Sequence, residues 1–173
     1  MKSNASIHWV VGLCMACLAQ YAGAQNTMEN PNWVEEQVPP PPAYSKANLI
    51  PIEMPLYVSL KIGVDPNTVA VGGDGIVRYV VVMLNATGTA NAAYEGIRCF
   101  TDEVKTYARV GSSGEWTINT DPQWKPVNGN MPSRHAQAIA RQGACDARLA
   151  PSTVDVLKAL KRNTKPSKRD WVF

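Results

Sequence analysis

The middle of the chain alternates between short apolar runs and turn sequences, a pattern typical of β-strands joined by hairpins. The runs are rich in β-branched and aromatic residues, which favour strands. They predict six strands, over residues 56–62, 68–71, 76–84, 91–99, 104–110 and 116–119. Glycine- and asparagine-containing turns at residues 72–75, 85–89 and 111–114 separate several of them. Short connections join antiparallel neighbours, so we expect a meander sheet of about five to six strands.

The run over residues 76–84 is apolar on both faces, which predicts a central strand covered on each side. Two helices are expected to supply cover, over residues 132–142 and 151–162, each with a proline in its first turn. In the second helix, Val154, Leu157 and Leu160, with Val156, form an apolar stripe. The pattern therefore predicts an α+β domain over residues 56–162, in which the sheet packs against two C-terminal helices.

Residues 25–55 precede this domain and are rich in proline, including the consecutive Pro39, Pro40, Pro41 and Pro42. Proline lacks an amide donor, so this part is expected to be an extended strap rather than a helix or an inner strand. Recognition by a proline-reading domain is the alternative. The acidic pair Glu35 and Glu36 is expected to be solvated. Apolar residues on both sides of the run can anchor it to the domain, namely Trp33, Tyr44, Leu49, Ile50 and Ile52.

Residues 1–24 have the layout of a secretory signal peptide. The apolar run over residues 7–18 is shorter than the roughly 20 residues that a transmembrane helix needs. Small residues at Ala22 and Ala24 predict cleavage after Ala24 and release of the mature chain, from Gln25, into the periplasm. A lipoprotein anchored at Cys17 is the alternative. No transmembrane helix is expected after cleavage.

Cleavage would remove Cys14 and Cys17 and leave Cys99 and Cys145. A lone pair of cysteines in an oxidising compartment normally closes on itself, so we predict a disulfide between them. A redox-active pair is disfavoured, because such cysteines usually lie close together in the sequence.

The formal net charge of +3 is too small to indicate nucleic acid as a partner. The positive charge is concentrated at the end of the chain, where residues 155–173 carry six basic and two acidic residues. Residues 163–173 are expected to form a basic flexible tail, which is either simply solvated or touches an anionic envelope surface. Its end, Trp171-Val172-Phe173, resembles a peptide that PDZ domains capture by strand addition.

Few residues of the mature chain suit catalysis or metal binding. His135 is the single histidine that remains, and Ser133 is too close to it in sequence for a nucleophile elbow. We therefore expect His135 on a helix surface, and no metal or cofactor. The aromatic residues Tyr107, Trp116 and Trp124 are expected either to pack in the core or to form a platform for a sugar or a peptide.

Several charged residues fall in or near the predicted strands. Folding the chain about the turn at 85–89 brings residue 78 opposite residue 95 or 96, so Glu95 is expected to pair with Arg78. The alternative is an anion- or peptide-binding face in which Arg98 holds a carboxylate. Gly96 is expected at a bulge or at a place where another backbone approaches closely. Asp102 and Glu103 are adjacent and point to opposite sides of a strand, which disfavours a glycosidase pair.

Three blocks of this region resemble the signature of a known family. They are Asp74-Gly-Ile-Val-Arg78-Tyr79, Tyr94-Glu95-Gly96-Ile97-Arg98-Cys99, and Glu103 with Tyr107. They are similar to blocks of the cryptic neisserial protein-like family of exported proteobacterial proteins, whose domain is functionally uncharacterised. The resemblance covers most of residues 33–160. It implies one domain in the periplasm or envelope, and it supplies no catalytic residues.

Together these features favour a non-catalytic binding or scaffold protein of the cell envelope, with an envelope protein or peptide as partner. The alternative is a hydrolase of envelope polymers that uses Glu95, Asp102 or Glu103. The candidate binding residues are Arg78, Tyr94, Glu95, Arg98, Glu103 and Tyr107.

Overall fold

The computed structural model describes residues 30–111, 113–129 and 133–162. The expected signal peptide, its cleavage site, Cys17 and the basic tail lie outside the described residues. The chain divides into two units, residues 1–32 and 33–173, and the sheet and helices belong to the second. No helix within the described ranges has the length and apolar character needed to cross a membrane.

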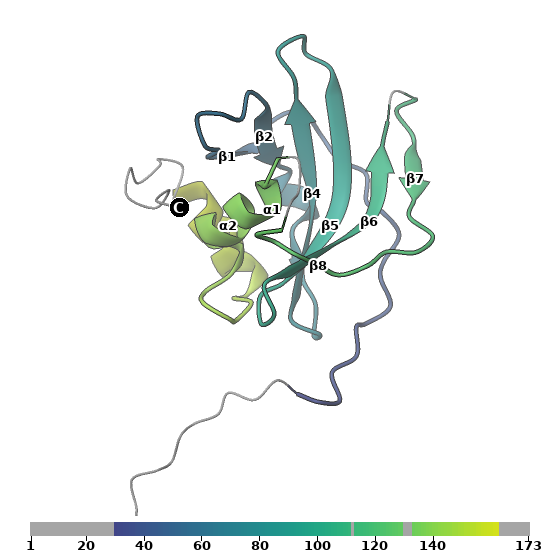
Figure 1. Ribbon diagram of the computed structural model, residues 1–173, viewed down its shortest axis with the longest axis vertical. Helices are drawn as coiled ribbons and strands as arrows, with labels where there is room; N and C mark the ends of the chain where they lie inside the picture. Colours follow the sequence, from purple (N-terminus) through teal and green to yellow (C-terminus); the bar gives the residue numbers. More distant parts are fainter. Residues whose placement is uncertain (1–29, 112, 130–132, 163–173) are drawn as a thin grey trace, which may run out of the picture. The chain divides into compact units, whose positions relative to one another are not determined.

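An antiparallel sheet forms the body of the second unit (Figure 1). Its strands follow the order β1-β2-β4-β5-β6-β7, with β3 also paired to β4 and β8 also paired to β6. Neighbours along this path are consecutive in the chain or separated by one short strand, so the expected α+β meander is confirmed. The strands are β1 (Ile50–Ile52), β2 (Lys61–Val64), β3 (Ala70–Val71), β4 (Ile76–Leu84), β5 (Ala90–Arg98), β6 (Glu103–Val110), β7 (Trp116–Ile118) and β8 (Lys125–Pro126).

The strand bounds differ most from expectation before β4. The expected strand over residues 56–62 begins only at Lys61, and Leu56 and Tyr57 are exposed in the loop that precedes it. The expected strand over 68–71 is shortened by a 3-10 turn, η1 (Pro66–Thr68), because Asp65 caps the turn through Asn67 N and Pro66 favours its first position. Strands β1 and β8 are additions, and β1 accommodates Pro51 because it lies at the edge of the sheet.

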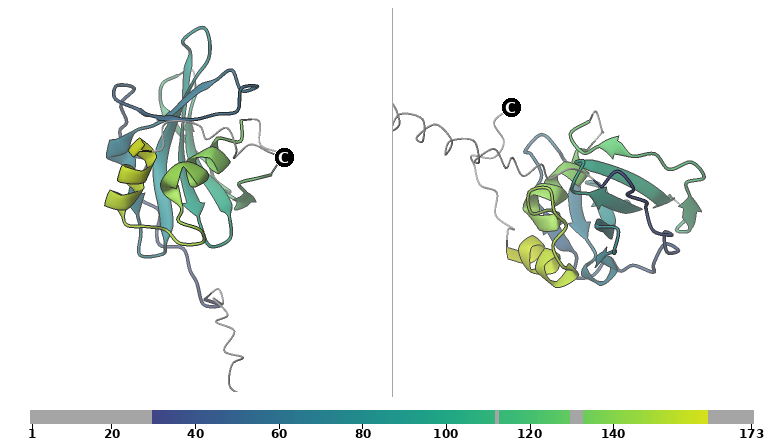
Figure 2. Two further views of the ribbon diagram at one scale, coloured as in Figure 1. Left: turned by 90° about the vertical axis from the view of Figure 1, so that its left-hand side faces the viewer. Right: turned by 90° about the horizontal axis from the view of Figure 1, so that it is seen from below.

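Two helical segments cover one face of the sheet (Figure 2). Helix α1 (His135–Ile139) continues into a π-helical turn, η2 (Ala140–Ala144), and α2 is Thr153–Arg162. The predicted apolar stripe of α2 is confirmed for Val156 and Leu160, which are buried, and for Leu157, which packs against the core, but it is wrong for Val154, which is 72% exposed. The buried Gln142 side chain donates to the carbonyl oxygens of Pro51 and Leu160, which joins η2 to β1 and α2.

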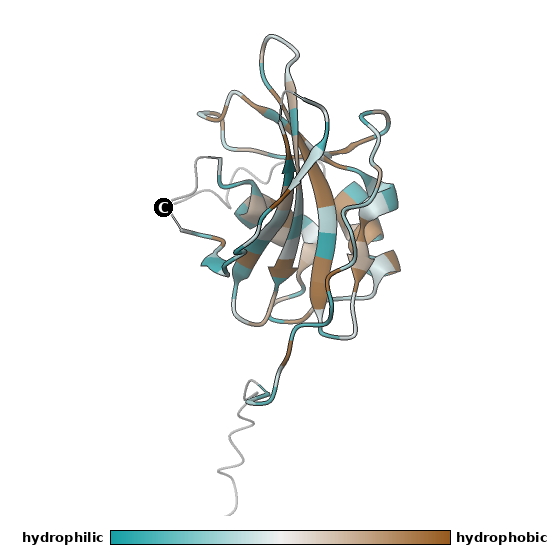
Figure 3. Cartoon of the chain, turned by 90° about the vertical axis from the view of Figure 1, so that its right-hand side faces the viewer, coloured by the Kyte–Doolittle hydropathy of each residue, from teal (hydrophilic) through white to brown (hydrophobic). Residues whose placement is uncertain are grey.

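The central strand β4 is buried on both faces, as expected. Val77, Tyr79 and Val81 point to the helices, and Val80 and Val82 point to the opposite face. That opposite face is covered by chain that is neither helix nor strand: Val38, Tyr44 and Leu49 pack on it together with Trp116 of β7. Figure 3 shows the mixture of hydrophobic and hydrophilic positions along these strands. The sheet is therefore the middle layer, with helices on one side and N-terminal coil on the other.

The disulfide between Cys99 and Cys145 is present, so the predicted pairing is confirmed. It joins the residue after β5 to the residue after η2, across a sequence separation of 46. The helical layer is thus covalently attached to the sheet.

We predict that Cys99→Ala/Cys145→Ala lowers the free energy of unfolding by about 4 kcal/mol, since the bridge restricts a long loop of the unfolded chain. Urea unfolding of the oxidised wild type and of the variant measures the difference. A difference below about 1 kcal/mol would contradict this explanation, in which the bridge stabilises the fold by restricting the unfolded chain.

Candidate functional site

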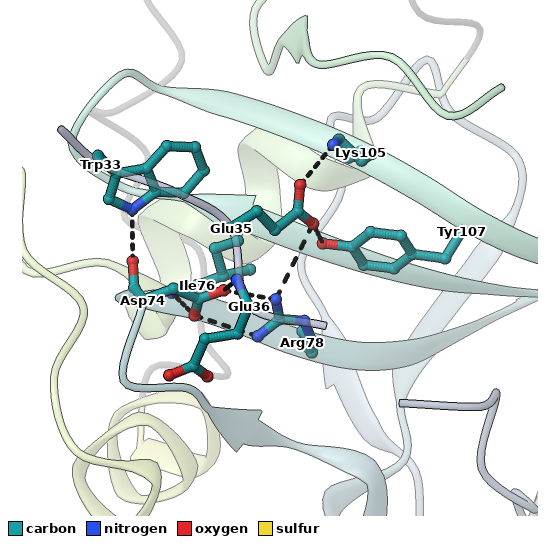
Figure 4. Close-up of polar contacts among 8 residues, drawn as sticks. All are labelled: Trp33, Glu35, Glu36, Asp74, Ile76, Arg78, Lys105 and Tyr107. Atoms are coloured by element: carbon teal, nitrogen blue, oxygen red, sulfur yellow. Dashed lines mark hydrogen bonds and ion pairs between the residues drawn. The ribbon is translucent and has the colours of Figure 1, made fainter. Parts of the chain in front are cut away.

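Buried charges lie on the sheet face opposite the helices, where residues 33–36 cross it (Figure 4). We call this set the Arg78 cluster. Its side chains come from the N-terminal coil, from the turn between β3 and β4, and from strands β4 and β6. The members are Trp33, Glu35, Glu36, Asp74, Arg78, Lys105 and Tyr107.

Arg78 and Asp74 form a bidentate ion pair at the centre of the cluster. Arg78 NH1 donates to Asp74 Oδ1 at 3.2 Å and NH2 donates to Oδ2 at 2.6 Å. The exposed fraction is 5% for the Arg78 side chain and zero for that of Asp74. Burial alone would raise the pKa of Asp74, but hydrogen bonds from Arg78 and from the Ile76 and Glu36 amides outweigh it, so the pKa lies below its usual value. The pair therefore stays ionised.

Glu35 completes the cluster from the N-terminal coil. Its carboxylate accepts hydrogen bonds from Lys105 Nζ and, at 2.8 Å, from Tyr107 Oη, and lies 3.9 Å from Arg78 NH2. Burial and the bond to Glu35 raise the pKa of Tyr107, so the phenol keeps its proton and donates. The expectation that Glu35 is solvated is wrong: its side chain is only 16% exposed. Glu36 is exposed, and its amide donates to Asp74 Oδ2.

Trp33 holds the start of the coil. Its indole Nε1 donates to the Asp74 carbonyl oxygen at 2.8 Å. The Arg98 guanidinium lies 3.5 Å from the centre of a Trp33 ring, and the rings of Trp33 and Trp124 meet edge to face with centres 6.3 Å apart. Trp116 instead packs against Tyr44, so Trp116 and Trp124 stack with different residues of the N-terminal coil.

Gly96 creates the space that Tyr107 occupies. A β-bulge in the pairing of β5 with β6 follows Tyr94, so that Tyr94 pairs with Ala108 and Glu95 with Thr106. A Cβ atom on Gly96 would lie 2.6 Å from Tyr107 Oη and 2.8 Å from Ile76 Cγ2. The bulge thus lies next to Gly96, between Tyr94 and Glu95, and the groups that approach Gly96 closely are side chains and not another backbone.

A second polar cluster lies on the helix side of the sheet. We call it the His135 cluster; it is formed by Tyr79, Glu95, Thr106, Ser133 and His135. His135 Nε2 is 2.8 Å from Glu95 Oε2, and Nδ1 is 2.6 Å from Ser133 Oγ. Tyr79 and Thr106 also donate to the Glu95 carboxylate. Burial raises the pKa of Glu95, but the interactions with His135 more than offset it, so the pKa is lowered.

Two expectations about these residues are wrong. The register of β4 with β5 pairs Arg78 with Gly96 and Tyr79 with Glu95, so Arg78 and Glu95 project to opposite faces and do not pair with each other. Each finds another partner, Asp74 for Arg78 and His135 for Glu95. His135 is not on a helix surface but 3% exposed, because the side chains that follow it, Ala136, Ala138 and Ile139, turn α1 toward the sheet.

The candidate binding residues therefore do not form one site. Arg78 and Tyr107 belong to the Arg78 cluster, and Arg98 touches it through Trp33. Tyr94 packs beside Tyr107 with ring centres 5.3 Å apart, and burial raises its pKa. Glu95 is in the His135 cluster, while Glu103 is half-buried at the start of β6, opposite Arg98 in the ladder.

Sequence reasoning missed the contributions of Trp33, Glu35 and Asp74 to the first cluster and of Ser133 to the second. Asp74 lies four residues before Arg78 across a glycine-rich turn, which is a signal that a local ion pair could form. Trp33 lies close in sequence to the acidic residues Glu35 and Glu36. Nothing in the sequence pattern indicated which strands these side chains would contact.

The two clusters differ in what they can do chemically. The Arg78 cluster binds a carboxylate and an indole through groups fixed on a sheet. The His135 cluster contains serine, histidine and a carboxylate in series, as a hydrolytic triad does, but the serine contacts Nδ1 and the carboxylate Nε2, the reverse of the usual arrangement. Ser133, His135 and Glu95 are 7%, 3% and 0% exposed. This second arrangement is closed to a substrate.

These features define a class: a disulfide-linked α+β domain whose antiparallel sheet carries helices on one face and N-terminal coil on the other. A family model described as the CNP1-like family matches residues 28–161. The chain belongs to this family, which confirms the resemblance seen in the sequence. No curated protein and no solved structure matches the chain significantly.

We predict that Asp74→Asn lowers the free energy of unfolding by about 2–4 kcal/mol, because it leaves the buried Arg78 without its counter-charge. The pKa of Asp74 is lowered in the folded protein, so its stabilisation is complete above its usual pKa of 3.8 and is lost as the pH falls through the folded value. Wild-type stability should therefore fall below about pH 4, and the variant should show a shallower acid limb.

Denaturant unfolding from pH 2 to 7 measures both effects. The matched control is Asp121→Asn, which removes an exposed carboxylate and should change stability by no more than about 0.5 kcal/mol. Equal effects of the two substitutions would contradict the importance of the buried pair.

Proposed function

We propose that this protein is exported to the periplasm or cell envelope and acts there as a non-catalytic binding or scaffold protein. The observation that carries the proposal is the burial of the His135 cluster. Among the described residues it is the arrangement closest to a catalytic one, and its polar groups are used in internal hydrogen bonds. Such a cluster stabilises the contact between helix and sheet, as buried polar networks do when their members are paired.

Two features support export. The sequence of residues 1–24 has the length and the small residues of a cleaved signal peptide. The disulfide between Cys99 and Cys145 favours an oxidising compartment, since thiols are kept reduced in the cytosol.

The alternative function, a hydrolase of envelope polymers, would need an accessible pair of acids. Glu95 is fully buried, whereas Asp102 is exposed in the turn between β5 and β6. Asp102 lines a surface depression of about 640 Å³ together with Gln137, Arg141 and Cys145, among others. This depression is the place where a hydrolytic activity of Asp102 would act.

We predict that the purified mature protein releases no soluble fragments from peptidoglycan and cleaves no peptide or ester substrate above background. Glu95→Gln should lower the free energy of unfolding by about 1–3 kcal/mol, because the amide cannot replace the carboxylate as acceptor for its several donors. Asp102→Asn, which suits the positive φ of 54° at this residue, and Glu103→Ala should leave stability nearly unchanged. A wild-type turnover that any of the three substitutions abolishes, without a loss of thermal stability, would refute the non-catalytic function.

We predict that protein recovered from an envelope fraction begins at Gln25, as measured by intact-mass spectrometry. Cleavage after Ala24 leaves a soluble periplasmic chain. A mass corresponding to a lipidated Cys17 would contradict this location and would place the protein on a membrane.

A further inference from the structure

We propose that the sheet face under residues 33–36 is a peptide-binding site, and that its partner is a protein segment with a tryptophan two positions before a glutamate. Residues 33–36 occupy this site in the same chain and so block it. We call the site the docking face and define it as Asp74, Arg78, Arg98, Lys105, Tyr107 and Trp124. The inference rests on the proposed binding function and names its site and the chemistry of its partner.

The docking face provides separate contacts for an aromatic residue and a carboxylate. Arg98 and Trp124 contact the Trp33 ring, and the Asp74 carbonyl oxygen accepts its indole N–H. Lys105 and Tyr107 both donate to the Glu35 carboxylate. Most of these groups are on β4, β5 and β6 or in the turn before β4, so the sheet holds them in place whether or not the coil is bound.

The contact with the ligand backbone favours a peptide over a simple anion. The amide of Glu36 donates to Asp74 Oδ2 at 3.1 Å, and a fully ionised phosphate has no such donor. The Glu36 carboxylate also lies close above the turn, where a Cβ atom on Gly73 would be 2.6 Å from Glu36 Oε1. The turn thus leaves room for an extended chain with a second acidic residue.

The coil over the docking face is held by side-chain contacts and not by a core of its own. Residues 33–38 form no strand, and Val34 is 78% exposed between the two anchors Trp33 and Glu35. Residues 33–36 contribute no side chain to the apolar cluster on this face, so their local opening breaks fewer contacts than unfolding of the sheet does. Apolar packing of the coil begins at Val38 and continues at Tyr44 and Leu49.

Opening would leave Lys105 and Tyr107 without the carboxylate that they bind. The Arg78–Asp74 pair would remain, because both residues belong to the sheet and its turn. A second peptide with the same tryptophan and glutamate would restore the lost contacts. It must compete with a segment whose tether gives it a high effective concentration, so the intact chain should bind such a peptide weakly.

The test uses the full mature chain and a fluorescently labelled peptide with the sequence of residues 30–38, NPNWVEEQV. Trp33→Ala/Glu35→Ala releases the coil and leaves the docking face intact. Val34→Ala/Gln37→Ala is the matched control, because both side chains are exposed. Fluorescence anisotropy should show that the released variant binds the peptide at least about tenfold more tightly than the control does.

Two further changes test the chemistry of recognition. Adding Lys105→Ala and Tyr107→Phe to the released variant should weaken binding by about tenfold or more. A peptide with alanine for tryptophan and glutamine for the first glutamate should not bind. A released variant that keeps its disulfide and cooperative unfolding but does not bind the wild-type peptide would overturn the proposal. So would a dimer of the intact chain that the released variant cannot form, because the partner would then be a second copy.

Wild-type protein provides a second measurement that needs no variant to fold. The indole N–H resonance of Trp33 in a ¹⁵N-labelled chain reports its bond to Asp74 O. An excess of unlabelled peptide should shift this resonance only slightly toward that of a solvent-exposed tryptophan, because the tethered segment competes with the peptide. Exchange of the indole N–H with deuterium as slow as that of the β4 amides would contradict opening of the coil. Mass analysis of the peptide afterwards separates the two proposals: bound and cleaved peptide would refute only the non-catalytic function, and absent binding would refute only the docking face.

Discussion

The pairing of β4 with β5 determines where the buried charges of Arg78 and Glu95 lie. The ladder runs without a shift from Ile76 opposite Arg98 to Leu84 opposite Ala90. Successive side chains of a strand point to opposite faces, so the register places Arg78 on one face and Glu95 on the other. A slip of β5 by one residue would place Glu95 opposite Arg78 and both charges on the same face. The two charges are therefore separated by the same constraint that builds the core.

Each separated charge then requires a partner from another element, because a buried charge without a counter-charge costs several kcal/mol. Asp74, in the turn before β4, supplies the counter-charge for Arg78, and His135, at the start of α1, is hydrogen-bonded to Glu95, whose carboxylate also accepts from Tyr79 and Thr106. The first pair fixes the turn to the strand and the second fixes the helix to the sheet. The disulfide adds a covalent attachment of the same helical layer to the sheet, because Cys145 follows η2 directly.

The sequence allowed the sheet to be predicted well in its centre and poorly at its edges. The run from Ile76 to Leu84 had the apolar character of a covered strand, and its bounds agree with β4. The edge strands β1 and β8 have only three and two residues, and β8 is exposed. Their hydrophobic pattern is therefore too short to distinguish them from loops. On α2, periodicity correctly placed Val156 and Leu160 on the buried side, but it also placed Val154 there, and packing against the sheet leaves that residue exposed.

The candidate site shows the same division between local and long-range information. The fold-back about the turn at residues 85–89 correctly placed residue 78 near residue 96, yet pairing Arg78 with Glu95 ignored that adjacent residues lie on opposite faces. Glu35 and Lys105 are 70 residues apart in the chain, and no periodicity links them. Their contact depends on where the whole coil crosses the sheet.

The packing of Tyr107 shows why the two faces of the sheet are not equivalent. On the helix side, large apolar side chains interlock with α1 and α2, so this contact can open only by breaking the core. On the other side, the absence of a side chain at Gly96 lets Tyr107 lie flat and direct its hydroxyl to Glu35. A replacement ligand can satisfy that hydroxyl and Lys105 without disturbing a core contact. The partner exchange that we propose would therefore take place on the face that carries the coil, because residues 33–36 contribute no side chain to the apolar cluster there.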